Sequence, residues 1–136
     1  MRIRPAGRLL AAIAGAIAVS AAVSPTAAAA ADTTPPSTPT VIYAWGYQCL
    51  EMVVGFTRST DDVTPQRDLR YEVFANGEFV GWIGDYGQNP NPYGSVYAVV
   101  PGANNVTIQA VDAAGNRSAT SNAQVAEPTL EPFCTG

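Results

Sequence analysis

The sequence has 136 residues, of which 11 are acidic and 7 are arginines, and it contains no lysine and no histidine, so the formal net charge is −4. The missing histidines and lysines remove the most common general bases and Schiff-base nucleophiles. The excess of acidic residues makes nucleic acids and anionic membrane surfaces poor partners, because their phosphate groups would be repelled.

The N-terminal segment has the pattern of a secretory signal peptide. Three arginines lie among the first eight residues, and an apolar run of 15 residues, Leu9–Val23, follows them. Small residues then lead to Asp32, and an apolar run of this length is short for a membrane span. We therefore expect residues 1–31 to be a signal peptide cleaved near Ala31, and the protein to be secreted and extracellular, without membrane insertion. The remaining chain would carry four arginines against eleven acids, a net charge of −7.

The rest of the chain predicts one small all-β domain. Residues 32–40 form a Pro-rich lead-in whose three prolines exclude a helix. Beyond it, short apolar segments alternate with turn residues, and Asn76–Gly77 is a strong hairpin signal because both residues tolerate positive φ. This pattern indicates an antiparallel β-sandwich of about seven strands. The expected strands are 40–45, 48–56, 69–75, 78–84, 95–100, 106–112 and 118–126.

Four segments in this order resemble fibronectin type III modules of secreted actinobacterial proteins. They are the entry DTTPPSTPT, STDD after the second strand, YEVFANG at the third strand and AVDAAGN at the sixth, and the resemblance covers Asp32 to Ala126. Modules of this family are found beside the catalytic domains of chitinases and cellulases. The resemblance implies a fibronectin type III-like, immunoglobulin-like sandwich over residues 41–126. Two positions depart from the family pattern, since Phe56 stands where a core tryptophan is usual and Asn104 stands where a corner tyrosine is usual.

The two cysteines, Cys49 and Cys134, predict one disulfide, because an even pair in an exported chain is normally oxidised. The family topology places the start of the second strand at the pole where the last strand ends, so the two residues can meet. The bridge would tie the C-terminal tail, residues 127–136, across the outside of the sandwich and seat Phe133 there. Closing a loop of this length stabilises by roughly 4–5 kcal/mol in the chain-entropy model. A redox role is the alternative, and nothing in the sequence indicates a low thiol pKa.

The stretch QAVDAAGNRSATS, residues 109–121, is interpreted as a turn between the last two strands. Gly115 supplies positive φ, Asn116 tolerates it, and Asp112 can accept backbone N–H groups. An anion site is disfavoured by the acidic surroundings and the lack of a following helix. A calcium site is the sharper alternative, since the family topology brings the loops after the second and sixth strands to one pole. Its ligands would be Asp61, Asp62, Asp112 and Asn116, unless Arg117 neutralises the acids.

The sequence predicts a binding module and no enzyme. Most carboxylates fall in loops or at outward strand positions, and a sandwich of this length has no room for an enclosed cleft. Most of the aromatic residues are expected in the core, but glycine and asparagine surround Trp82, Tyr86 and Tyr93 in the segment Trp82–Tyr97. Exposed rings there would suit the faces of sugars.

We therefore expect a secreted, non-catalytic binding or adhesion module, monomeric and without a cofactor, that recognises an extracellular protein or polysaccharide. The alternatives are an accessory module of an extracellular polysaccharide-degrading system and a structural spacer. Both rest on fold-level analogy, which does not by itself carry function.

Overall fold

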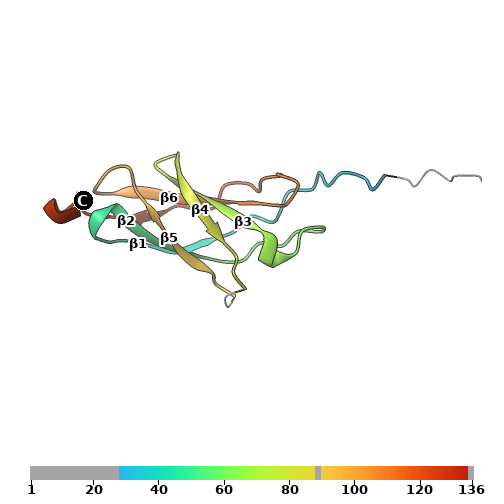
Figure 1. Cartoon of the computed structure of the whole chain (residues 1–136), viewed down its shortest axis with the longest axis horizontal. Helices are drawn as coiled ribbons and strands as arrows, with labels where there is room; N and C mark the ends of the chain where they lie inside the picture. Colours follow the sequence, from blue (N-terminus) through green and yellow to red (C-terminus); the bar gives the residue numbers. More distant parts are fainter. Residues whose placement is uncertain (1–27, 88–89, 135–136) are drawn as a thin grey trace, which may run out of the picture.

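The computed structural model of the chain describes residues 28–87 and 90–134; most of the predicted signal peptide, residues 1–27, lies outside this range, as do Gln88 and Asn89. Seven antiparallel strands form two sheets (Figure 1), which confirms the fibronectin type III-like, immunoglobulin-like β-sandwich. One sheet has the order β1 (Val41–Gly46), β2 (Glu51–Phe56), β5 (Tyr93–Tyr97). The other has the order β4 (Glu78–Gly84), β3 (Arg70–Ala75), β6 (Asn104–Val111), β7 (Gln124–Ala126).

The helical elements of the described chain are short 3-10 turns, namely η1 (Gln48–Leu50), η2 (Gln66–Asp68) and η3 (Pro132–Cys134). Within the described ranges, no helix has the length and apolar character that a membrane crossing requires. In Figure 1 the blue lead-in leaves one end of the sandwich, and the red C-terminal turn lies at the opposite end.

The core lies between the two sheets and follows the two-residue period of the strands. Met52, Val54 and Phe56 of β2 are fully buried, as the alternation predicted, and they face Tyr71 and Val73 of β3. The ring centroids of Phe56 and Tyr71 lie 4.4 Å apart. Phe56 therefore packs directly on this tyrosine within the core.

The hairpin between β3 and β4 turns at Asn76 and Gly77, with φ values of 52° and 84°, as predicted.

Buried hydroxyl and amide groups fix two further corners. The Tyr71 hydroxyl accepts a hydrogen bond from the Ser59 backbone N–H at 2.9 Å, and burial raises the pKa of Tyr71, so the phenol stays protonated.

Asn104 fixes the turn that leads into β6. Its side chain is buried and its Nδ2 donates to the carbonyl oxygens of Val100 and Gly102, at 3.1 and 2.8 Å. Its Oδ1 accepts from the Asn76 side chain at 3.1 Å. The Asn104 side chain thus satisfies the backbone carbonyl groups of the turn that precedes β6.

Some strand ends differ from expectation for local reasons. β2 begins at Glu51 and not at Gln48, because Cys49 and Leu50 have φ values of 58° and 63° within η1. Both β5 and β6 begin two residues earlier than expected, and β5 ends at Tyr97.

The last strand, expected over 118–126, is restricted to Gln124–Ala126. Upstream of it, serine hydroxyls accept hydrogen bonds from backbone N–H groups of β6. Ser118 Oγ accepts from the Ala110 N–H and Ser121 Oγ accepts from the Ile108 N–H, both at 2.9 Å. The chain therefore follows β6 here without continuing the regular ladder of strand hydrogen bonds.

The predicted disulfide between Cys49 and Cys134 is present, with the two Cα atoms 5.1 Å apart. The tail also pairs through its backbone, because the Thr129 N–H donates to Tyr47 O and Thr129 O accepts from the Leu50 N–H. The expectation for Phe133 was wrong: its side chain is 68% exposed. The hydrogen bonds and the disulfide hold the tail without burying that ring.

Candidate functional site

The turn after β6 is built around the Asp112 carboxylate, as predicted. This side chain is buried; its Oδ1 accepts from the Asn116 N–H and its Oδ2 from Asn116 Nδ2, both at 2.8 Å. Burial acts to raise the pKa of Asp112, but the hydrogen bonds from Asn116, Gly115 and Ala114 outweigh it and hold this pKa below its ordinary value. Gly115 has a φ of +93°, as the turn requires.

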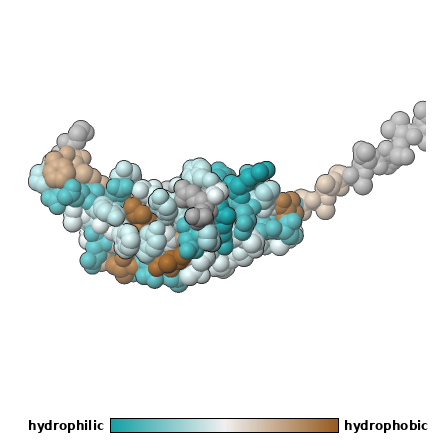
Figure 2. Space-filling model, turned by 90° about the horizontal axis from the view of Figure 1, so that it is seen from below, coloured by the Kyte–Doolittle hydropathy of each residue, from teal (hydrophilic) through white to brown (hydrophobic). Residues whose placement is uncertain are grey.

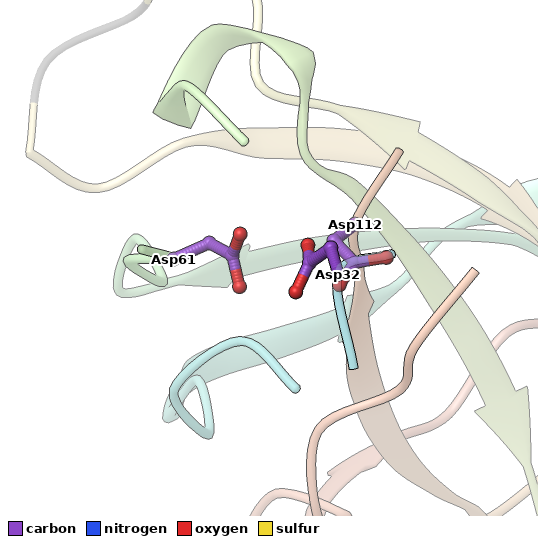
Figure 3. A group of neighbouring side chains, drawn as sticks. All are labelled: Asp32, Asp61 and Asp112. Atoms are coloured by element: carbon purple, nitrogen blue, oxygen red, sulfur yellow. The ribbon is translucent and has the colours of Figure 1, made fainter. Parts of the chain in front are cut away.

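Three carboxylates meet beside this turn. One oxygen from each of Asp32, Asp61 and Asp112 lies within 4.8 Å of the others. Figure 3 shows the carboxylate of Asp61 pointing across from the loop after β2 toward those of Asp32 and Asp112. We call these three residues the acidic cluster. It joins the Pro-rich lead-in, the loop after β2 and the end of β6.

The acidic cluster differs from the calcium ligand set inferred from the sequence. Asp62 is exposed and lies outside the cluster. The Asn116 amide supports the cluster, since its Nδ2 donates both to Asp112 and to the Asp32 carbonyl oxygen, at 2.8 and 3.1 Å. Sequence reasoning missed Asp32 because it was assigned to an extended entry segment.

The suggestion that Arg117 neutralises these acids was wrong. Arg117 makes a bidentate ion pair with Glu72, with Nε–Oε2 and Nη2–Oε1 distances of 2.8 and 2.9 Å. This hydrogen-bonded pairing lowers the pKa of Glu72 below its ordinary value. The other arginines of the described chain are engaged elsewhere: Arg58 with Asp85, Arg67 beside Asp68, and Arg70 over the Trp82 ring.

The three aromatic residues proposed from the sequence lie on different surfaces. Trp82 lies on the outer face of the sheet that contains β4, with the Arg70 guanidinium 4.9 Å from its ring centroid and the Phe79 ring 5.6 Å away. Tyr86 is 80% exposed just beyond β4. Tyr93 belongs to β5, in the other sheet. The structure therefore does not gather the three rings on one sheet face.

A second set of aromatic residues shares the outer face of the sheet β1–β2–β5. The strand register aligns Tyr43 with Gly55 and Tyr93 in one row, and it places Trp45 in the next row beside Val53. The rings of Tyr43 and Trp45 stack, with their centroids 4.6 Å apart. We call the apolar and aromatic side chains on the outer side of this sheet the aromatic face; they are Tyr43, Trp45, Val53, Tyr93 and Tyr97, and Glu51 and Ser95 lie among them.

Gly55 leaves room for the Tyr43 ring on the aromatic face. A Cβ at this position would lie 2.2 Å from the Tyr43 ring, so that ring covers the glycine backbone. Trp45 is 55% exposed and Tyr97 is 61% exposed. The expectation that most of these rings belong to the core was therefore wrong for this face. The alternation of Tyr43 and Trp45 around the buried Ala44 was the signal that could have identified it.

A depression of about 590 Å³ borders the aromatic face at the disulfide end, lined in part by Tyr47, Glu51 and Tyr97. On the face seen in Figure 2, strongly hydrophobic residues form small separate brown patches among hydrophilic ones. The molecule thus offers exposed amphipathic rings beside a carboxylate at the edge of an open surface.

Comparisons with known proteins found similarity to solved structures alone. No family model matches the sequence, and no curated protein matches it. A solved structure, described as fibronectin(III)-like modules of Clostridium thermocellum CbhA, is similar to this chain with a TM-score of 0.48 and 15% sequence identity. The match covers 71% of this chain and 47% of that one, so this chain spans less than half of the protein it matches.

Proposed function

We propose that this protein is a secreted, non-catalytic module that binds the surface of a neutral polysaccharide through the aromatic face. The observation that carries the proposal is the row arrangement of Tyr43, Trp45, Tyr93 and Tyr97 on one sheet face, with Trp45 and Tyr97 more than half exposed. Exposed Tyr and Trp rings combine an apolar plane with a polar tip, which suits the apolar faces and hydroxyl groups of sugar rings.

The negative net charge of the molecule favours uncharged over anionic polysaccharides as ligands. The chain beyond residue 31 has a net charge of −7, so anionic polysaccharides would be repelled, whereas uncharged polymers such as cellulose or chitin would not. The open form of the aromatic face suits a chain of several sugar rings better than a single small molecule, which normally requires a deeper pocket.

Two features support secretion. The N-terminal 31 residues have the signal-peptide pattern, and Cys49 and Cys134 form a disulfide, which persists in oxidising compartments.

A retention assay on insoluble cellulose, chitin and bacterial cell wall tests the proposal. The exported protein is compared with a double variant of the aromatic face, W45A/Y97A, and with a matched control, W82A/Y86A, which removes a tryptophan and a tyrosine outside it. We expect the aromatic-face variant to lose about tenfold or more in affinity, because a central aromatic anchor typically contributes more than 1 kcal/mol. The control should bind like the parent protein.

Two results would contradict the proposal: no retention of the parent protein on cellulose or chitin, or a loss of binding in W82A/Y86A with none in W45A/Y97A. The second result would instead support recognition through the Trp82–Tyr97 segment.

A further inference from the structure

We propose that the acidic cluster of Asp32, Asp61 and Asp112 binds a calcium ion that fastens the Pro-rich lead-in to the sandwich. The three residues come from segments far apart in the sequence, yet one oxygen from each lies within 4.8 Å of the others. Figure 3 shows the carboxylates directed toward a common region. This inference does not depend on the polysaccharide proposal.

Unpartnered buried oxygens distinguish the cluster from an ordinary group of surface acids. Asp32 Oδ2 and Asp61 Oδ1 each expose less than 1 Å² and have no hydrogen-bond partner. The other oxygens are committed, because Asp32 Oδ1 accepts from Thr34 N and Asp61 Oδ2 accepts from the backbone N–H groups of Val63 and Thr64. Buried carboxylate oxygens without donors are costly, and a cation bound between Asp32 and Asp61 would satisfy both of them.

No side chain of the described ranges supplies that cation. Each of their four arginines is directed to another group, and the two nearest in sequence, Arg58 and Arg117, are paired with Asp85 and Glu72. Negative charge on carboxylates this close together would be unfavourable without a cation between them. A bound divalent ion would balance this charge.

The donor set selects calcium among the common metal ions. The three side chains of the cluster offer carboxylate oxygens, the sequence contains no histidine, and its two cysteines form a disulfide. Zinc and the softer transition metals prefer nitrogen or sulfur. Calcium accepts irregular arrangements of oxygen ligands completed by water, whereas magnesium requires near-ideal octahedral geometry.

The neighbouring contacts are arranged so that the ion would join three segments. Thr64 Oγ1 accepts from the Ala113 N–H at 3.1 Å and so links the loop after β2 to the turn after β6. Ser37 and Thr60 exchange backbone and side-chain hydrogen bonds of 2.8 Å, which align the lead-in with the same loop. Calcium at the cluster would add to the contacts that hold Asp32, whose carbonyl oxygen already accepts from Asn116.

The test is calcium titration of the exported protein after treatment with chelator, followed by calorimetry and by thermal unfolding. We expect binding heat with calcium, a much weaker response to magnesium, and a melting temperature raised by roughly 10 °C at about a hundred times the dissociation constant. D61N should abolish the heat and the shift. D62N is the matched control, because Asp62 is the exposed neighbour outside the cluster, and it should respond like the parent protein.

D32N provides a second variant whose change lies in the lead-in, outside the core, in case D61N fails to fold. Absence of both heat and thermal shift in the parent protein would overturn the proposal, and so would an equal response in D61N or D32N. The first result would favour the new α-ammonium group of a chain cleaved after Ala31 as the cation beside Asp32.

Discussion

Glu72 makes the stability of the sandwich depend on pH. Its side chain is buried on the outer face of β3 and its charge is balanced by Arg117, which reaches over from the turn after β6. The ordinary pKa of 4.5 is lowered by this pairing, so the ion pair contributes its full stabilisation above that value. The contribution is lost as the pH falls from 4.5 through the lower pKa of the folded state.

We therefore predict that the urea midpoint of the parent protein falls between pH 6 and pH 3, and that E72Q shows a shallower decline. E78Q, which changes an exposed acid on β4, serves as the control and should keep the slope of the parent protein. Identical slopes for E72Q and the parent would show that the ion pair does not contribute to stability.

At the scale of elements, β6 is hydrogen-bonded along the edge opposite β3 by serine hydroxyls as well as by the short strand β7. Ser118 is buried, and its Oγ accepts the hydrogen bond of the Ala110 backbone N–H. Replacing Ser118 with Ala would leave that buried N–H without its acceptor, which typically costs about 1–3 kcal/mol.

Chemical denaturation of S118A should reveal this loss, with the denaturant dependence unchanged. T120A alters an exposed residue two positions away and should remain within about 0.5 kcal/mol of the parent protein. If S118A and T120A were equally stable, the hydroxyl would not be essential to the edge.

Which elements could be predicted depends on how local their causes are. The alternation of Met52, Val54 and Phe56 and the Asn76–Gly77 turn are short-range signals, and both were predicted correctly. The late start of β7 depends on hydroxyls that bond to a neighbouring strand, which a propensity for extended structure does not reveal.

The candidate sites were harder to predict for the same reason. The acidic cluster needs Asp32 and Asp112, which are far apart in the sequence, to meet through the sheet topology. The aromatic face forms because β1 and β5 both pair with β2, which brings residues far apart in the sequence onto one surface. A search for aromatic residues within one loop selected Trp82 and Tyr86 instead.

At the scale of the whole molecule, the C-terminal tail and the lead-in are held at opposite ends of the sandwich and by different contacts. The C-terminal tail is fixed by the disulfide between Cys49 and Cys134, which spans 85 positions, and by backbone hydrogen bonds around Thr129. The lead-in leaves from the other end of the sandwich (Figure 1). The aromatic face lies along the sheet between these ends, next to the depression at Tyr47 and Glu51.

Removing the disulfide with C49S/C134S should lower stability by up to about 4–5 kcal/mol, because the unfolded chain regains the freedom of a long loop. The melting temperature should drop, and limited proteolysis should then cut within residues 127–134. Reduction of the parent protein should reproduce the drop, while the double variant should be insensitive to reductant. A variant that melts at the temperature of the oxidised parent would exclude a stabilising role for the bridge.

The aromatic face can be tested most directly by fluorescence, because Trp45 and Trp82 are the only tryptophans in the sequence. In W82F the emission comes from Trp45 alone, and in W45F from Trp82 alone. Titration with soluble cello- and chito-oligosaccharides should change the emission of W82F saturably and leave W45F unchanged. A response confined to W45F, or none in either variant, would contradict binding at the aromatic face.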